Sequence, residues 1–281
     1  MLYLFYDTET TSAERNTDIV SIAIIATKKS SNGFVPAWGG NMEASSFVSL
    51  CKPKKRVTPD ARLVHGITDN ALRNAPPFKM VWSQLVIWIQ RMMDKTQLKR
   101  HVLVAHNGRG FDDIVLSHNL FRYCDSKTVE DNLRESGCAG FVDTLKLLRG
   151  LYETKENRPI NTDTGRKSFT LTNCHKLLCG SAFDGAHDAL ADTLALIRVC
   201  NAKGIHALLC SRLLCKYTIS LVDHVKSLPM VMQHPPQRKD PQVITNGDQP
   251  VLNCDHSNIE RFDSDTLSRL CLKCMCFVIS A

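Results

Sequence analysis

Carboxylates and histidines recur in three short segments of this 281-residue chain, at spacings that suit metal-assisted chemistry. The first segment, Asp7-Thr8-Glu9, directly follows the apolar run Leu2 to Tyr6. Side chains two residues apart on a strand point the same way, so Asp7 and Glu9 are expected to project together. Two carboxylates held that close repel each other unless a cation lies between them, which indicates a divalent metal site.

The other two segments run from His106 to Asp112 and from His187 to Asp192. Asp112 would stand at the start of a helix, where it is either a metal ligand or simply a cap. Residues five apart do not share a face of a regular helix, so His187 should precede a helix on which Asp192 lies. Asp188 is expected to act structurally, through the helix dipole.

The elements that must position these residues follow from hydrophobic patterning. Five strands are expected, over residues 2–6, 19–27, 47–51, 101–105 and 140–142. Helices are expected over 81–93, through Leu116 and Leu120, and over 144–152, 170–178 and 188–203. Strands that come first and then alternate with helices predict a mixed α/β sheet covered on both faces.

Taken together, the three segments resemble the motifs of the DEDDh 3′→5′ exonucleases of the ribonuclease H-like fold, most closely the three-prime repair exonucleases. The family motifs D-x-E, H-N…D and H-x-x-x-x-D correspond to Asp7 and Glu9, to His106-Asn107 with Asp112, and to His187 with Asp192. Further matches are Leu103 to His106, Asp143-Thr144, Arg166 to Leu171, and Leu63 to Thr68 with His65 in place of a threonine. The resemblance covers roughly residues 1–205 and implies a mixed five-stranded sheet flanked by helices.

The resemblance also implies hydrolysis of phosphodiester bonds with two bound Mg²⁺ ions, for which Mn²⁺ should substitute. The expected ligands are Asp7, Glu9, Asp112 and Asp192, and His187 would take the proton from the attacking water. The activity expected is a 3′→5′ exodeoxyribonuclease that releases 5′-mononucleotides from single-stranded or frayed DNA 3′ ends. Two alternatives stay open, an exoribonuclease on short RNA and a non-catalytic nucleic-acid or protein interaction module on the same scaffold.

Substrate contacts are expected from the same resemblance. Glu9 and Thr10 would touch the terminal nucleotide, Val64 and Phe111 would pack on the terminal bases, and Arg166 and Lys167 would reach phosphates. Plain core packing is the alternative for Val64, and solvation is the alternative for Arg166 and Lys167. The family's glycine and leucine after the first motif are replaced by Ser12 and Ala13, which weakens the expected apolar wedge. The basic run Lys52, Lys54, Lys55 and Arg56 either follows a nucleic-acid strand or is a solvated loop.

The net charge of +7 lies entirely in residues 1–215, which hold 28 Lys and Arg against 21 Asp and Glu. This surplus favours a polyanionic partner. No run approaches the roughly 20 apolar residues that span a bilayer, and Met1 to Tyr6 lack the basic leader of a signal peptide. We therefore expect no membrane association and an intracellular location, in cytoplasm or nucleus, with the twelve cysteines as free thiols or metal ligands.

The chain is expected to comprise a DEDDh exonuclease domain over residues 1–215, a Pro-rich linker over 216–250 and a Cys/His-rich tail over 251–281. In the tail, Cys254, His256, Cys271 and Cys274 have a spacing that could close a tetrahedral zinc site. The alternative is a disordered tail with incidental thiols. A homodimer through an edge strand is expected from the resemblance alone.

Overall fold

The computed structural model describes residues 1–124, 127–152, 158–160, 164–202, 205 and 218–234, together with the backbone of three strands in the tail. The chain divides into two units, Met1–Gln237 and Arg238–Ala281. In the described residues, no helix has both the length and the apolar composition needed to cross a bilayer.

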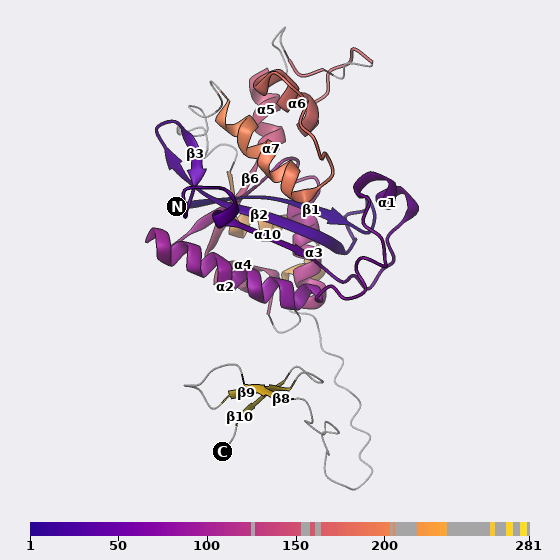
Figure 1. The fold of residues 1–281 in the computed structure, drawn as a ribbon, viewed down its shortest axis with the longest axis vertical. Coiled ribbons are helices and arrows are strands. Elements are labelled where there is room, and N and C mark those ends of the chain that lie inside the picture. Colours follow the sequence, from indigo (N-terminus) through magenta and orange to yellow (C-terminus); the bar gives the residue numbers. More distant parts are fainter. Residues whose placement is uncertain are drawn as a thin grey trace. The chain divides into compact units, whose positions relative to one another are not determined.

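A seven-stranded mixed sheet forms the centre of the first unit (Figure 1). Its strands are β1 (Leu2–Thr10), β2 (Ile19–Ser30), β3 (Gly33–Pro36), β4 (Ser46–Leu50), β5 (His101–Ala105), β6 (Cys138–Asp143) and β7 (Thr218–Ser220). The order is β3-β2-β1-β5-β6-β7, with β4 also paired to β2. β1 runs antiparallel to β2 and parallel to β5, and β5 runs parallel to β6.

Helices cover both faces of the sheet, which confirms the predicted α/β architecture (Figure 1). They are η1 (Glu43–Ser45, a 3₁₀ turn), α1 (Pro59–His65), α2 (Phe78–Thr96), α3 (Asp112–Tyr123), α4 (Val129–Glu135), α5 (Thr144–Tyr152), α6 (Leu171–Cys179), α7 (Ala189–Asn201), α10 (Leu221–Ser227) and α11 (Met230–Gln233). One core lies between the sheet and α2, α3, α4 and α10. A second core lies between the opposite face and α5, α6 and α7.

Local sequence explains where the helices that matter most begin and end. In α2 the buried side chains recur every three or four residues, as an amphipathic helix requires. At α1 the hydroxyl of Thr58 accepts the Ala61 N–H, Pro59 fills the first turn, and Gly66 ends the helix in the left-handed conformation. Asp188 caps α7 by accepting the N–H groups of Leu190 and Ala191.

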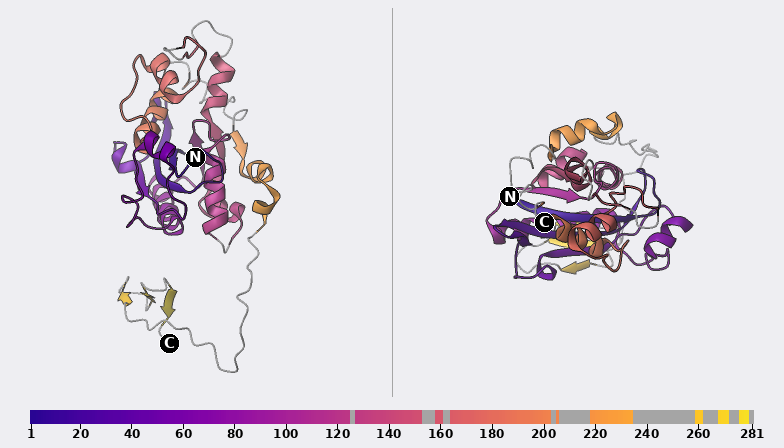
Figure 2. Two further views of the ribbon diagram at one scale, coloured as in Figure 1. Left: turned by 90° about the vertical axis from the view of Figure 1, so that its right-hand side faces the viewer. Right: turned by 90° about the horizontal axis from the view of Figure 1, so that it is seen from above.

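The predicted sheet of five strands is wrong in its count, because β3 and β7 add two more. Both are only three or four residues long, too short to carry a readable alternation. β7 and the two helices after it also fall inside the predicted linker 216–250. They pack instead on the first unit, where Leu221, Val225, Leu228 and Met232 are buried in the core, and Figure 2 shows this orange segment beside the magenta helices.

The second unit is described as a three-stranded antiparallel sheet, ordered β10-β9-β8. Its strands are β8 (Ile259–Arg261), β9 (Ser268–Cys271) and β10 (Cys276–Ile279). Cys271 at the end of β9 is the register partner of Cys276 at the start of β10. The other expected zinc ligands, Cys254, His256 and Cys274, lie outside the described residues.

Candidate active site

Strand β1 carries the first two carboxylates to the C-terminal end of the central strand. Asp7 is half-buried and paired in register with Ala23, and Glu9 is buried and paired with Ser21. Because side chains alternate along a strand, the side chains of Asp7 and Glu9 point to the same face of the sheet as Phe5, which belongs to the core under α7. Asp7 and Glu9 therefore face α7, as their two-residue spacing predicted.

Helix α7 supplies the third carboxylate. Asp192 lies in the first turn of α7, and His187 precedes the helix with a left-handed φ of 70°. The backbone N–H of His187 donates to Asp192 Oδ2 at 2.8 Å, which fixes this carboxylate. One oxygen each from Asp7, Glu9 and Asp192 lie within 4.8 Å of one another.

Asp112 approaches from the opposite face of β1, as the first residue of α3. The hydroxyl of Thr8 donates to Asp112 Oδ1 at 2.7 Å, and the Asp112 side chain is buried. The next residue, Asp113, accepts a 2.5 Å hydrogen bond from the Tyr6 hydroxyl. The four expected metal ligands thus lie around β1. Asp7, Glu9 and Asp192 have oxygens within 4.8 Å of one another, and Asp112 comes from the opposite face of the strand.

The crowding of buried acids shifts their pKa values upward. Burial raises the pKa of Asp7 well above its usual range, and the charges of Asp112, Asp192 and Glu9 raise it further. Burial followed by repulsion from Asp192 and Asp112 raises the pKa of Glu9 to about 8. Burial also raises the pKa of Asp112 to about 6, although the hydrogen bond from Thr8 opposes this shift. The site therefore has a large excess of negative potential.

The donor set fits a hard divalent cation. All the candidate ligands offer carboxylate oxygens, the type that Mg²⁺ and Mn²⁺ prefer. In the described part of the chain, the ion pairs join Arg122 to Asp18, Lys127 to Glu135 and Arg134 to Glu130, and none neutralises the four acids. A bound cation would supply the missing positive charge.

A cavity of about 360 Å³ adjoins Glu9 and collects the residues expected to contact the terminal nucleotide. Its lining includes Thr10, Val64 and Phe111. Val64 is 53% exposed, so it is not a core residue. Ser12 and Ala13, the two departures from the family pattern, line the same cavity.

Arg166 and Lys167 are both exposed, and neither of them lines the cavity beside Glu9. Lys167 lines a separate cavity of about 550 Å³ together with His106, Asn107 and Arg149. His106 is held there through Nδ1 by the Thr144 hydroxyl at 3.0 Å and through Nε2 by the Phe169 carbonyl at 2.7 Å. The predicted contact of Lys167 with a phosphate would therefore be made from this other cavity.

Two residues that contribute to the site were missed by the sequence analysis, Thr8 and His65. Thr8 had a signal, because the residue between two carboxylates on a strand must face the other way, toward α3. His65 Nδ1 accepts the Ile67 N–H, so its Nε2 carries the proton and donates to the Thr10 carbonyl at 3.0 Å. This bond ties α1 to the end of β1 and so fixes one wall of the cavity beside Glu9.

Comparison with known proteins places this geometry in context. The model of the exonuclease family RNase_T matches residues 4–200. The DNA polymerase III subunit epsilon of Buchnera aphidicola subsp. Schizaphis graminum is 28% identical over 138 residues, 49% of this chain and 52% of that protein. Three-prime repair exonuclease 1 of Bos taurus is 29% identical over 154 residues, 54% of this chain and 45% of that protein. The chain spans about half the length of these curated relatives.

Solved structures of exonuclease I share the fold. One structure of exonuclease I superposes with a TM-score of 0.58 at 21% identity, covering 76% of this chain and 45% of that one. E. coli exonuclease I in complex with a dT13 oligonucleotide gives a TM-score of 0.53 at 23% identity, covering 80% and 43%. A zinc-bound complex of the E. coli enzyme with single-stranded DNA gives 0.54 at 21% identity, covering 76% and 42%.

Proposed function

Because the chain belongs to the RNase_T exonuclease family, we propose that it is a metal-dependent 3′→5′ exonuclease that acts on DNA. The observation that carries the proposal is the convergence of Asp7, Glu9 and Asp192 oxygens within 4.8 Å, next to a cavity large enough for a nucleobase. We assign the catalytic unit to the N-terminal domain predicted over residues 1–215, extended by β7, α10 and α11, which pack on it.

Asp7, Glu9, Asp112 and Asp192 would hold two Mg²⁺ ions, with Mn²⁺ as a substitute. When bound, such ions offset phosphate charge and stabilise both the attacking and the leaving oxygen. Thr8 orients Asp112 through its 2.7 Å hydrogen bond, and the His187 backbone orients Asp192. His187 is exposed and adjoins Asp192 through its backbone N–H, and its imidazole would take the proton from the attacking water.

The cavity beside Glu9 receives the terminal nucleotide. Val64 and Phe111 offer it an exposed aliphatic surface and an aromatic surface, and contacts of this kind tolerate any base. Thr10 stands at the end of β1, next to Glu9, where it contacts the sugar or its 3′ oxygen. We infer that the enzyme releases 5′-mononucleotides from single-stranded or frayed 3′ ends. The DNA in the exonuclease I complexes, and the name of the DNA polymerase III subunit epsilon, favour DNA over RNA.

A digest of 5′-labelled DNA and RNA of one sequence, with Mg²⁺, with Mn²⁺ and with EDTA, tests the proposal. Wild type is compared with Asp192→Asn and His187→Ala, and with Asp94→Asn on α2 as a control for removing an exposed acid. We expect a metal-dependent ladder on DNA that persists in Asp94→Asn and is lost in the other two variants. A ladder on RNA alone would support the exoribonuclease alternative, and no cleavage of either polymer would refute the enzyme.

A further inference from the structure

A third cavity, of about 280 Å³, lies between the loop that joins β4 to α1 and residues 69–73, which follow α1. Five cations and one carboxylate line it, Lys52, Lys54, Lys55, Arg56, Arg73 and Asp69. All six side chains are exposed. In the described residues, no ion pair joins these five cations to a carboxylate. We call this set the basic cradle.

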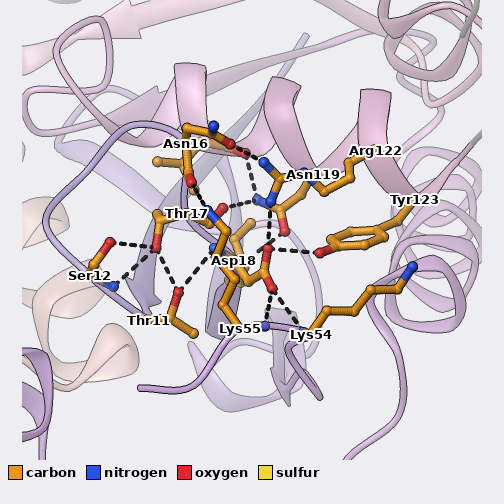
Figure 3. Close-up of polar contacts among 12 residues, drawn as sticks. Thr11, Ser12, Asn16, Thr17, Asp18, Lys54, Lys55, Asn119, Arg122 and Tyr123 are labelled. Carbon is orange, nitrogen blue, oxygen red and sulfur yellow. Dashed lines mark hydrogen bonds and ion pairs between the residues drawn. The ribbon is translucent and has the colours of Figure 1, made fainter. Parts of the chain in front are cut away.

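The backbone of the basic cradle is held by a buried carboxylate. Asp18 is 1% exposed, and its Oδ2 accepts the N–H groups of Lys54 at 2.8 Å and Lys55 at 2.9 Å (Figure 3). Its Oδ1 accepts the Arg122 guanidinium and the Tyr123 hydroxyl, each at 2.8 Å. Arg122 thus compensates the buried charge, while the exposed side chain of Lys54 places its ammonium over the Tyr123 ring, 5.0 Å from its centroid.

Further hydrogen bonds join the basic cradle to the loop after β1. The Thr11 and Thr17 hydroxyls lie 2.8 Å apart, and the Lys55 ammonium donates to the Asn16 carbonyl. The Thr58 N–H donates to the Thr11 carbonyl at 2.9 Å. The backbone of the run is therefore held at Lys54 and Lys55, while its side chains are exposed, so a nucleic-acid contact stays a proposal.

The basic cradle and the cavity beside Glu9 are lined by residues that lie close together in the chain. Arg56 lines the cradle and Thr58 lines the cavity beside Glu9. Two residues span at most about 7 Å of chain. A strand whose last base lies in the cavity therefore has its neighbouring phosphates within reach of these cations.

We propose that the basic cradle binds backbone phosphates of the nucleic-acid substrate beyond the terminal nucleotide, an inference that rests on the proposed function. The planar guanidinium of an arginine can donate two parallel hydrogen bonds to phosphate oxygens, and loses little conformational freedom when it does so. The phosphates belong either to the strand being cut or to its complement.

The test uses the full chain and the double variant Arg56→Gln/Arg73→Gln, with Arg91→Gln, an exposed arginine on α2, as the matched control. Substrates are a dinucleotide, a 12-nucleotide single strand and a duplex with the same 3′ end. We expect kcat/KM on the 12-mer to fall about tenfold or more, with the dinucleotide changed less than twofold. The slope of log(kcat/KM) against log salt should become shallower by about 0.7 for each lost phosphate contact. Affinity for the 12-mer in EDTA, by fluorescence anisotropy, should fall in parallel.

A loss that appears only with duplex assigns the phosphates to the complementary strand, and a loss with the single strand assigns them to the strand being cut. Equal losses on dinucleotide and 12-mer, no loss on any substrate, or the same loss in Arg91→Gln would each overturn the proposal. If wild type cuts none of the substrates, the exonuclease proposal fails instead. The anisotropy measurement then still decides whether the cradle binds phosphates.

Discussion

At the scale of single residues, Thr8 divides the site between the two faces of one strand. Asp7 and Glu9 face α7, while Thr8 faces α3 and donates to Asp112. The position of Thr8 between Asp7 and Glu9 on β1 therefore fixes where the Asp112 carboxylate lies relative to the carboxylates of Asp7 and Glu9. Thr8 is a positioning residue, because it acts through Asp112 and needs no contact with substrate.

Replacing Thr8 by valine keeps the shape of the side chain and removes the 2.7 Å hydrogen bond to Asp112. Hydrogen bonds to charged groups contribute about 1.5–3 kcal/mol, so we expect kcat to fall about 10- to 100-fold at saturating Mg²⁺, with KM for DNA little changed. Thr8→Ser retains the hydroxyl and should restore most of the activity. Wild-type kcat in Thr8→Val, or an equal loss in Thr8→Ser, would contradict this role.

Replacing Asp192 by asparagine should lower the activity but raise the thermal stability of the metal-free protein. Burial raises the pKa of Asp192 although the hydrogen bond and charge of His187 oppose this shift, and the charge of Asp192 in turn raises the pKa of Asp7 and Glu9, so this charge is unfavourable in the metal-free protein. Asp192→Asn can still accept the His187 N–H, and we expect it to raise Tm in EDTA by a few degrees while reducing activity at least 100-fold. Adding Mg²⁺ should raise Tm of wild type more than that of the variant. A lower Tm of Asp192→Asn in EDTA, relative to Asp94→Asn, would show that repulsion among the acids does not limit the stability of the metal-free protein.

At the scale of elements, the sequence predicted long helices and strands better than elements of three or four residues. Long periodic segments such as α2, and acids placed beside strand and helix ends, were predictable because periodicity and capping act locally. β3, β7 and α11 were not, because three or four residues carry no period and are stabilised by the neighbours on which they pack. Likewise, the sequence could not show that a buried carboxylate holds the backbone of Lys54 and Lys55, because Asp18 lies 36 residues away from Lys54 in sequence.

The packing of α10 and α11 gives a prediction about where the first unit ends. A chain stopped after residue 215, the boundary predicted from sequence, loses four buried side chains of the core, Leu221, Val225, Leu228 and Met232. Each buried side chain of this size contributes about 1.5–3 kcal/mol, which together rival the whole stability of a domain. We expect the chain ending at 215 to aggregate or unfold without a cooperative transition, and the chain ending at 237 to unfold cooperatively in urea. Equal urea midpoints would show that this segment adds nothing.

At the scale of the whole molecule, the tail is a separate unit, for which we keep the zinc site as a proposal. The full chain, purified without chelator, should carry about one zinc per chain by elemental analysis, and Cys271→Ser should lose it while Cys51→Ser, a buried thiol of the first unit, should not. Zinc that is absent from wild type, or retained in Cys271→Ser, would favour incidental thiols. The predicted homodimer stays a prediction that light scattering can decide.

Buried histidines should make the first unit sensitive to acid. Burial lowers the pKa of His101 to about 4, and burial with a nearby Arg109 lowers the pKa of His224 to about 4. Since the unfolded chain has ordinary values near 6.5, it binds more protons, and stability must fall as pH drops from about 6.5 toward 4. Each of the two histidines should cost about 2 kcal/mol between pH 7 and pH 5.

The variant His224→Gln isolates one of these contributions. The glutamine amide can replace the 2.8 Å contact of His224 Nε2 with the Ser117 hydroxyl but does not titrate. Unfolding free energies from urea titrations at pH 7, 6 and 5 should therefore fall less steeply in His224→Gln than in wild type. The half-buried His118, replaced in His118→Gln, serves as the comparison, because burial lowers its pKa less. If the slope of His224→Gln matches that of wild type, the burial of His224 on the inner side of α10 is not the source of the acid sensitivity.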